Sequence, residues 1–594
     1  MLVSRHHIIL SCLLLTTTLI SGEILNRGWW NHTVFYQIYP RSFMDSDNDG
    51  VGDLKGVTSK LEHFVTSGVG AIWLSPINRS PMVDFGYDIS DFKDIDKIFG
   101  TMSDFQNLLT RAKELGLKVI LDLVPNHTSD EHYWFRESIN RTGKYEHYYI
   151  WADGEDNNTS PPNNWISLFG GRAWSYNLTR NQWYLHQFHK RQPDLNYTNP
   201  DVQEEMKEVI LFWLRKGVDG FRVDAVPYLF EANYTLDEPK SGKEGVTKDD
   251  HDYLNHVLTK DLPETYELVQ SWRRILDEYA DQYNTSEKVM MTEAYTTLEN
   301  TIKYYNYGSH IPFNFNFITK ANNASNATMF KNIIDDWMKG IPNGGVANWV
   351  MGNHDNNRIA SRFPGRTDQM TMLAMILPGV AVTYYGEEIG MVDKMDISWN
   401  DTQDPQACNA GEEKYQSRSR DPARTPFQWS FDVNAGFSKA KKTWLPVHEN
   451  YIDVNLVVEK FVNESHYRVY RALTELRNTS DALKFGSLTT DVINNTVLCV
   501  LRKTSKEEVI LLINFSDTDI QKVDLTKNLT QFENGMVKIT SVGAQVKQNK
   551  TFALNNVIVP ANVSMVLISN AAMEYVASLQ IILLSLSLLL TLYK

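Results

Sequence analysis

Four apolar stretches of this sequence each end on carboxylates or imidazoles, and this repeated pattern constrains the fold more than any other feature. The stretches are Lys118–His127, Gly220–Tyr228, Val289–Tyr295 and Asn348–Asp355. Each is typical of a short buried strand, because β-branched and other apolar residues dominate it. In parallel α/β barrels the functional side chains lie at the C-terminal ends of the strands. The sequence therefore predicts an α/β fold with acidic and imidazole groups gathered at one end of a parallel sheet.

The stretch around Arg222 and Asp224 is the central one. Side chains alternate along a strand, so these two residues should project from the same face. The arginine would hold the carboxylate ionised at neutral pH, as a nucleophile requires. A structural ion pair is the alternative, and it would be the better interpretation if this pair stood alone. The three other stretches favour a catalytic role.

Length and charge narrow the class of protein. The chain has 594 residues, of which 42% are hydrophobic, so it can bury a large core and should form more than one domain. Its formal net charge of -14 argues against binding nucleic acid, whose phosphates require a basic surface. A neutral substrate agrees better with this composition.

With two further stretches, Gln192–Asn196 and Arg420–Trp429, the sequence resembles the α-amylase superfamily of glycoside hydrolases (family 13) from about Trp29 to about Ile568. Within it, the similarity is to the oligo-glucosidase branch that includes insect maltases. The resemblance implies a (β/α)8 TIM barrel formed by residues 23–127 and 197–477, with a domain B inserted after strand 3 at 128–196. An antiparallel β-sandwich, domain C, is expected at 478–568. The barrel strands outside the four stretches are expected at 33–39, 71–75, 310–317 and 380–385, and helices at 102–115 and 200–216.

The same resemblance implies a retaining exo-α-glucosidase. Asp224 would be the nucleophile, Glu293 the general acid and base, and Asp355 a carboxylate that stabilises the transition state. The first glucose would be held by seven further residues: Asp84, Tyr87, Asp122, His127, Arg222, His354 and Arg424. Tyr87 would stack on the sugar ring, and Arg424 would pair with Asp84.

The residue after the nucleophile bears on linkage. In the branch that this sequence resembles, a small residue such as Ala225 accompanies α-1,4 and sucrose-type substrates, whereas valine accompanies α-1,6 substrates. We therefore expect terminal α-1,4-linked glucose to be released from maltose, short malto-oligosaccharides and sucrose. An α-1,6-acting enzyme remains an alternative, as does a maltase that also serves as a receptor, because some mosquito gut maltases with a similar tail bind a bacterial toxin. The oligomeric state is left open, with a dimer as one option.

The loop from Asp45 to Asp53 carries carboxylates at alternate positions and a glycine that permits a sharp bend. This pattern would surround one hard cation with oxygen atoms. By resemblance the cation is a structural Ca²⁺, with the ligands Asp45, Asp47, Asp49, the carbonyl of Val51, and Asp53. A solvated acidic turn is the alternative.

The two ends of the chain predict export. Residues 1–22 combine Arg5, an apolar run from Ile8 to Ile20 and small residues, which is typical of a signal peptide. Residues 569–594 have the pattern of a GPI-attachment signal, with attachment between Ser569 and Ala572, although a single C-terminal membrane helix is an alternative. We expect a glycoprotein on the extracellular face of the plasma membrane, of the midgut type by resemblance.

Sequons that could carry glycans in the secretory pathway agree with export, and among many they include Asn140, Asn177, Asn284, Asn400 and Asn463. The sequon at Asn126 should stay bare, because it falls at the end of a buried strand. Cys408 and Cys499 could form a disulfide or remain free thiols.

Overall fold

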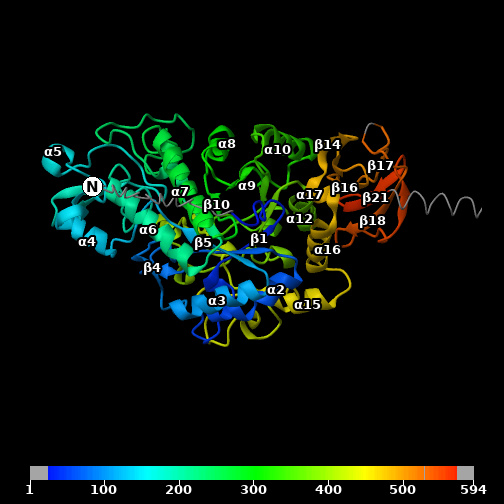
Figure 1. Cartoon of the computed structure of the whole chain (residues 1–594), viewed down its shortest axis with the longest axis horizontal. Coiled ribbons are helices and arrows are strands. Elements are labelled where there is room, and N and C mark those ends of the chain that lie inside the picture. The colour runs from blue at the N-terminus through cyan, green and yellow to red at the C-terminus, as the bar shows by residue number, and fades with distance from the viewer. Residues whose placement is uncertain (1–23, 528, 571–594) are drawn as a thin grey trace, which may run out of the picture.

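The structure, a computed structural model, describes residues 24–527 and 529–570. Three regions follow one another along the long axis of the molecule (Figure 1). A small region with α4 and α5 lies at one end, a barrel occupies the centre, and an antiparallel sheet with β16, β18 and β21 lies at the other end. The expected signal peptide, and the expected GPI signal from residue 571 onward, lie outside the described residues.

The centre is a parallel eight-stranded barrel, as predicted. Its strands, in chain order, are β1 (Val34–Ile38), β2 (Ala71–Leu74), β5 (Lys118–Leu123), β9 (Gly220–Val223), β10 (Val289–Thr292), β11 (Ile311–Pro312), β12 (Asn348–Val350) and β13 (Val380–Tyr384). Neighbours in this order pair in parallel, except β11 with β12, and β13 pairs with β1. The sheet closes between β11 and β12 through the side chain of Asn348, which donates to the carbonyl of Pro312 and accepts from the backbone N–H of Asn314.

One strand is shorter than predicted. A strand was expected over 310–317, but β11 has only two residues and the chain then turns into the short helix α9 (Asn316–Thr319). The apolar sequence continues past β11 because Phe313, Phe315 and Phe317 are buried beside the barrel. These residues add no further pairs to the parallel sheet. Periodicity alone does not separate these two cases.

Helices cover the outside of the barrel. They are α1 (Leu54–Ser59), α2 (Leu61–Thr66), α3 (Met102–Glu114), α6 (Pro200–Lys216), α7 (Pro263–Gln282), α8 (Leu298–Asn306), α10 (Ala327–Gly340), α11 (Ile359–Arg362) and α12 (Thr367–Ile376). The two helices that we predicted have clear end signals. A capping box between Thr101 and Asp104 starts α3, while Asn199 caps α6 and Gly217 ends it in the left-handed conformation.

The insertion between β5 and α6 corresponds to the expected domain B. It holds α4 (Tyr133–Ile139), α5 (Glu155–Asn158) and an antiparallel sheet of β6 (Trp151–Ala152), β8 (Gln182–Leu185) and β7 (Trp174–Asn177). Its small core is rich in tryptophan, including Trp165, Trp174 and Trp183. The long segment between β9 and α7 packs against it, since the Trp165 indole donates to the carbonyl of Leu236 at 3.0 Å.

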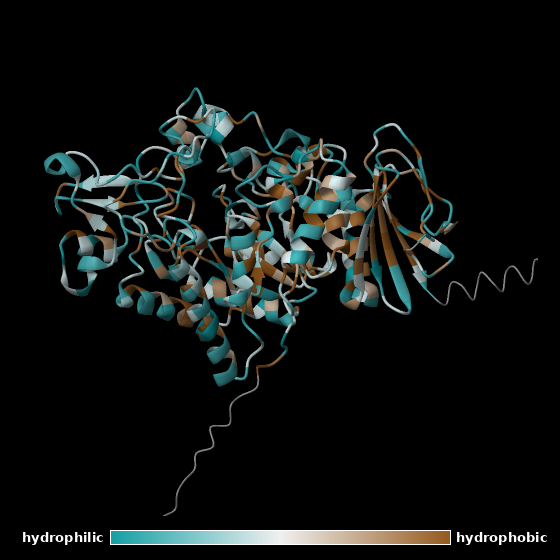
Figure 2. Cartoon of the chain, turned by 90° about the horizontal axis from the view of Figure 1, so that it is seen from above, coloured by the Kyte–Doolittle hydropathy of each residue, from teal (hydrophilic) through white to brown (hydrophobic). Residues whose placement is uncertain are grey.

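The C-terminal region begins after α16 (His466–Thr479) and α17 (Asp481–Phe485). A six-stranded antiparallel sheet contains β14 (Ser487–Ile493), β15 (Val497–Lys503), β16 (Glu507–Asn514), β21 (Ser564–Asn570), β18 (Asn534–Thr540) and β19 (Thr551–Ala553), and β17 (Gln521–Val523) pairs with β20 (Val557–Val559). Hydrophobic residues concentrate in the barrel and along these strands (Figure 2). The antiparallel architecture of the expected domain C is present.

The described residues narrow the expected anchor site and settle the state of the two cysteines. Ser569 is fully buried, and it pairs with Glu508 inside β21, so it is a poor attachment point for an anchor; Ala571 and Ala572 lie outside the described residues. Cys408 is exposed and Cys499 is buried, and neither forms a disulfide within the described chain. Among residues 24–527 and 529–570, no helix is long and apolar enough to cross a bilayer.

Candidate active site

A cavity of about 210 Å³ opens at the C-terminal ends of the barrel strands. Seven of the predicted site residues line it: Asp84, Tyr87, His127, Asp224, Glu293, His354 and Asp355. They come from distant parts of the sequence, and the barrel brings them together as predicted. Pockets for drug-sized ligands usually measure ~300–1,000 Å³, so this cavity suits a smaller group such as one sugar ring.

The floor of the cavity is built around Arg222, which is buried in β9. Its Nη1 atom contacts the carboxylate of Asp224, and its Nη2 atom lies 3.3 Å from Oε1 of Glu293. The second oxygen of Glu293 accepts the backbone N–H of Ala225 at 2.7 Å. Two carboxyl groups therefore meet across the cavity on a single cation.

Burial raises the pKa of both Asp224 and Glu293. Arg222 opposes this shift, while the neighbouring carboxylates reinforce it. Two carboxyl groups this close resist joint ionisation, so the pair retains a proton more readily than isolated acids would. Both carboxyl groups contact Arg222, and Asp224 makes the closer contact.

Ala225 adopts a left-handed backbone conformation, with φ of 49°. A non-glycine residue in this region is uncommon and stores local strain, which clusters at functional sites. Here the turn aims the backbone N–H of Ala225 at Glu293. The strained turn thereby links the two strands that carry the carboxyl pair.

Asp122 and Arg222 do not line the cavity, although both were expected to grip the first glucose. Asp122 receives hydrogen bonds from Arg222 at 2.8 Å, from the Tyr87 hydroxyl at 3.1 Å and from the Trp73 indole at 3.2 Å. Its side chain is completely buried, and its pKa is raised to about 6 by burial. Asp122 and Arg222 thus lie beneath the wall, where they hold the side chains that face the cavity.

The closed end of the cavity contains a network of carboxylates and arginines. Arg420 contacts Asp84 at 2.9 Å, Asp404 at 2.6 Å and Asp355 at 3.3 Å. Arg424 instead contacts Asp355 at 3.1 Å. The expected pairing of Arg424 with Asp84 is therefore wrong. The arginine that pairs with Asp84 is Arg420, four residues earlier in the sequence.

Asp355 differs from the pair on the floor. Burial opposes its ionisation, but His354, Arg420 and Arg424 together outweigh burial and lower the pKa of Asp355. Burial also lowers the pKa of His354 well below its usual range. Asp355 is consequently an ionised carboxylate at the cavity wall.

The two predicted histidines are both buried at the cavity. His127 Nε2 lies 3.1 Å from the Tyr87 carbonyl oxygen and 3.1 Å from the Gln192 amide, and burial lowers the pKa of His127 to about 4. The His354 ring stacks on Tyr87 with centroids 5.2 Å apart. One face of Tyr87 is therefore already covered by an imidazole.

Several residues of the cavity were missed from the sequence: Phe169, Phe188, Tyr228, Tyr295, Gln406 and Arg420. Tyr228 and Tyr295 follow the two catalytic candidates by four and two positions, which is a usable signal, and Arg420 begins a stretch that we had singled out. Phe169 and Phe188 lie in the insertion, which has no periodic pattern to identify them. The Asn126 side chain is buried, in agreement with an unglycosylated sequon, and it donates to the carbonyl of Tyr228.

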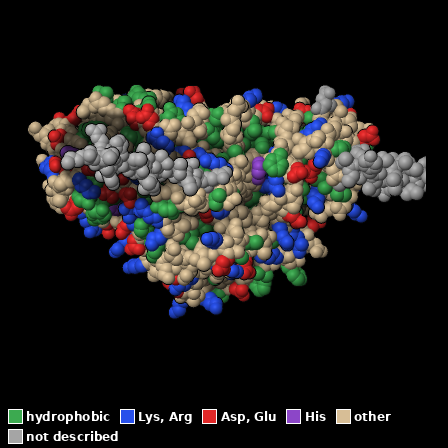
Figure 3. Space-filling view, viewed as in Figure 1, with side chains coloured by type: hydrophobic (Ala, Val, Ile, Leu, Met, Phe, Trp, Pro, Cys, Tyr) green, Lys and Arg blue, Asp and Glu red, His purple; other side chains and the backbone are tan. Residues whose placement is uncertain are grey.

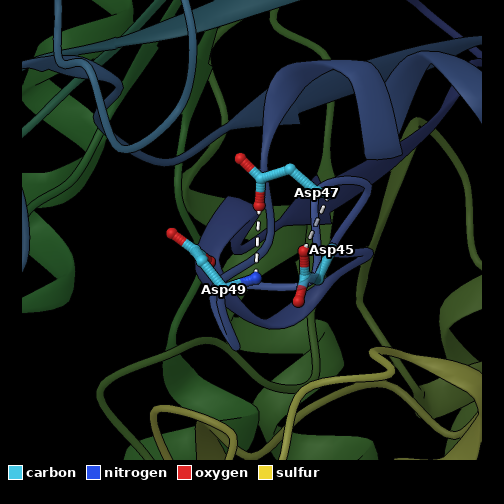
Figure 4. A group of neighbouring side chains, drawn as sticks. All are labelled: Asp45, Asp47 and Asp49. Carbon is cyan, nitrogen blue, oxygen red and sulfur yellow. Dashed lines mark hydrogen bonds between the residues drawn. The ribbon is translucent and has the colours of Figure 1, made fainter.

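The acidic loop after β1, whose carboxylates Figure 4 shows, contributes no residue to the cavity lining. Asp45, Asp47 and Asp49 each offer an oxygen atom, and these atoms lie within 4.8 Å of one another. Asp53 does not join them, since its carboxylate caps α1 at Gly56 and binds Ser46. The Val51 N–H donates to Asp49 at 2.8 Å. Three of the five expected ligands therefore converge in a donor set that suits a hard cation.

Comparison with known proteins agrees with this geometry. Residues 37–486 match the family described as alpha amylase, catalytic domain. Maltase 1 of Drosophila virilis is 52% identical over 512 residues, which cover 84% of this chain and 80% of the relative. A salivary alpha-glucosidase of Anopheles gambiae is 51% identical over 461 residues, which cover 76% of this chain and 77% of the relative.

Among solved structures, the alpha-glucosyl transfer enzyme XgtA matches 91% of this chain and 99% of its own, with a TM-score of 0.80 and 33% identity. The family match spans the barrel and its cavity, and the relatives at about half identity are maltases and α-glucosidases. The chain therefore belongs to the α-amylase family of glycoside hydrolases, in which it is an α-glucosidase of the insect maltase type.

Proposed function

We propose that this α-glucosidase removes single glucose units from the nonreducing end of α-1,4-linked substrates with retention of configuration. The observation that carries the proposal is the meeting of Asp224 and Glu293 on one guanidinium, at the floor of a small cavity closed by the Asp84–Arg420 pair. Retaining glycosidases place their two carboxyl groups only ~5–5.5 Å apart, whereas inverting enzymes leave room between them for a water molecule. The contact of both Asp224 and Glu293 with the Arg222 guanidinium supports the retaining arrangement.

In the first step an oxygen of Asp224 bonds to C1 of glucose while the bond from C1 to the leaving oxygen breaks. Glu293 gives its proton to that oxygen, so the departing sugar leaves as a neutral alcohol. In the second step water attacks C1, Glu293 takes the proton of the water, and Asp224 is released as a carboxylate. Asp355, ionised beside both groups, stabilises the positive charge that develops on the sugar ring.

The closed end of the cavity explains why the enzyme would act at the nonreducing end of a sugar chain. Asp84, Arg420 and Asp404 form an ion network behind the first sugar position, where a longer nonreducing chain would have to pass. Charged hydrogen-bonding groups in this position also suit the hydroxyl edge of a terminal glucose. On the face in Figure 3, acidic and basic side chains are interspersed, as expected for a protein whose ligand is neutral.

Product analysis tests this function. The purified enzyme should release glucose as the α-anomer from maltose and sucrose, and it should act weakly on isomaltose and on the interior of starch. The small side chain of Ala225 at the cavity wall supports this order of substrates. Release of β-glucose would overturn the retaining mechanism, and a preference for isomaltose would identify the α-1,6 alternative.

We further propose that Asp45, Asp47 and Asp49 hold a structural Ca²⁺. Oxygen donors from alternate residues of one loop are the ligands that calcium prefers. The loop packs against the segment after the barrel, because the Ser438 hydroxyl hydrogen-bonds Asp45 and the Trp444 N–H donates to the carbonyl of Gly50. An ion here would neutralise repulsion among the three carboxylates and stabilise that contact.

Export and anchoring complete the proposal. The salivary relative and the surface positions of the sequons at Asn140, Asn284, Asn400 and Asn463 support a secreted glycoprotein. We propose a GPI anchor attached after β21, at Ala571 or Ala572, since β21 occupies Ser569 and Asn570. Release of the enzyme from membranes by a phosphatidylinositol-specific phospholipase tests the anchor, and retention on the membrane would favour a spanning helix.

A further inference from the structure

A cleft of about 520 Å³, here called the interdomain cleft, lies between the barrel and the C-terminal sheet. One wall is the first half of α16 with the turn before it, and the other is the end of β18 with the loop that follows, residues 541–548. These two elements stand side by side at the boundary of the two regions (Figure 1). The interdomain cleft shares no lining residue with the catalytic cavity, so the proposed mechanism does not use it.

One residue of the lining can carry a covalent group. Asn463 is exposed in the turn between α15 (Leu456–Phe461) and α16, and it begins the sequon Asn463-Glu464-Ser465. An N-linked glycan starts at the side-chain amide of such an asparagine. A glycan on Asn463 would therefore begin at the wall of the interdomain cleft itself.

The turn that presents Asn463 is held from both sides. The Arg468 guanidinium donates to the carbonyl oxygen of Lys460, at the end of α15, at 2.8 Å. The Ser465 hydroxyl donates to the carbonyl oxygen of Glu459 at 2.6 Å and accepts the backbone N–H of Arg468 at 3.2 Å. The first sugar would thus leave the protein from a defined position.

The chemistry of the walls suits an N-acetylglucosamine ring. Val469 and Ala472 contribute apolar surface, while Thr540, Ser541 and Gln548 contribute hydroxyl and amide groups. Sugars combine apolar C–H faces with hydroxyl edges, so they need both kinds of contact. The volume of the interdomain cleft also falls in the usual range of ~300–1,000 Å³ for ligand sites.

The loop that forms the far wall is tied to the barrel at its start. The backbone N–H of Val542 donates to Asp368 in α12 at 2.8 Å, and Asp368 also pairs with His466 at 2.7 Å. Further along the loop, Gln545 and Lys547 are exposed. A group that fills the interdomain cleft would support this exposed part against α16.

We propose that the interdomain cleft binds the first sugars of an N-linked glycan on Asn463, which then stabilise the loop 541–548 against the barrel. Attachment bonds the amide nitrogen of Asn463 to C1 of N-acetylglucosamine, while the lipid diphosphate that carried the sugar leaves and the amide loses one proton. The inference rests on the proposed export, because the secretory pathway attaches this glycan. It adds a binding site for the sugar within the fold.

The test combines mass spectrometry with hydrogen exchange on the secreted enzyme. Glycopeptides should show Asn463 occupied, and Asn463→Gln should speed amide exchange in residues 541–548 by roughly threefold to tenfold. The unfolding temperature should fall by about 1–2 °C. Asn400→Gln, at an exposed sequon outside the interdomain cleft, is the matched control and should leave exchange in this loop unchanged. Both variants should hydrolyse maltose as the unaltered enzyme does.

Ser465→Thr keeps both the sequon and a hydroxyl at the start of α16, so it should retain slow exchange in the loop. A bare Asn463 in an enzyme glycosylated elsewhere, or equal exchange with and without the Asn463 glycan, would overturn the proposal. Protection that is lost in Asn549→Gln and kept in Asn463→Gln would assign the sugar to the sequon after the loop, and would also contradict it. A secreted enzyme with no N-glycan at any sequon would overturn the proposed glycoprotein as well, so the two failures are distinct.

Discussion

The closed end and the floor of the catalytic cavity use the same residue types in different proportions. At the closed end, Asp84, Asp355 and Asp404 share the two arginines Arg420 and Arg424. On the floor, three carboxyl groups, those of Asp122, Asp224 and Glu293, share Arg222 alone. The floor therefore has one cation fewer for the same number of acids.

The difference sets the protonation of each region. Although burial opposes ionisation, the arginines lower the pKa of Asp404, and together with His354 they lower that of Asp355. Burial raises the pKa of Asp224 and Glu293, where one arginine does not compensate. Asp84 is an exception at the closed end, because burial outweighs Arg420 and raises its pKa. A shortage of cations is thus what allows a proton to remain where the reaction needs an acid.

The largest expected effect comes from removing the nucleophile on the floor. Asp224→Asn should lower kcat/KM for maltose by roughly 10⁴-fold or more, because a neutral amide cannot form the glucosyl intermediate. Steady-state kinetics on the secreted variant measure the loss, and thermal unfolding checks that the fold is intact. Substantial residual turnover would remove Asp224 from the mechanism.

Glu293→Gln should separate substrates by leaving group. We expect a loss of about 10²- to 10⁴-fold on maltose, whose departing sugar needs a proton, and a much smaller loss in the first step on an activated aryl glucoside. Presteady-state release of the phenol measures that first step. Equal losses on both substrates would contradict the role of Glu293 as the acid.

At the closed end, Arg420→Ala should leave Asp84 and Asp404 without their shared cation. Removing one partner of a buried ion pair costs about 3–5 kcal/mol of unfolding free energy. KM should also rise for every substrate, since each one places its terminal glucose there. Arg418→Ala is the matched control, because Arg418 pairs with Asp250 at the surface, where such pairs contribute ~0–1 kcal/mol. Similar destabilisation by both variants would contradict the account of the closed end.

Acid pH should destabilise the cavity wall through its buried histidines. Burial lowers the pKa of His127 to about 4, below its usual value of 6.5, so the unfolded chain binds the proton more tightly. Stability from this group is present above pH 6.5 and is lost as pH falls toward 4, by about 3 kcal/mol. In denaturant titrations at several pH values, His127→Asn should weaken the pH dependence of the unfolding free energy. The control His147→Asn, at an exposed position, should retain that dependence. An unchanged dependence in His127→Asn would contradict this assignment.

The smallest effect is expected outside the cavity, at the acidic loop. A chelator should lower the unfolding temperature by a few degrees, as expected for losing about 2–3 kcal/mol of ligand stabilisation from a chain of this size. Asp47→Asn should lower the unfolding temperature measured without chelator, and it should reduce the further decrease that the chelator causes. An identical response in the variant and the unaltered enzyme would place the ion elsewhere.

The sequence predicted the parts of the molecule that are local or periodic. The strands before Asp122, Asp224, Glu293 and Asp355 were recognisable because each combines a buried apolar run with a terminal acid. A barrel then requires their ends to meet, so the floor of the cavity followed from the fold.

The closed end was harder to predict because it depends on three-dimensional distance. Arg420 and Arg424 stand in one stretch, and only the positions of Asp84 and Asp404 decide which arginine reaches which acid. Phe169 and Phe188 come from an insertion without periodicity, so no pattern marked them as cavity residues.

The most direct measurement is the identity of the residue that becomes covalently bound to the sugar. A fluorinated glucosyl substrate that forms the intermediate quickly and hydrolyses slowly should label the enzyme, and mass spectrometry of its peptides should locate the glucosyl group on Asp224. A label on Glu293 or Asp355, or an active enzyme that yields β-glucose and is never labelled, would contradict the account.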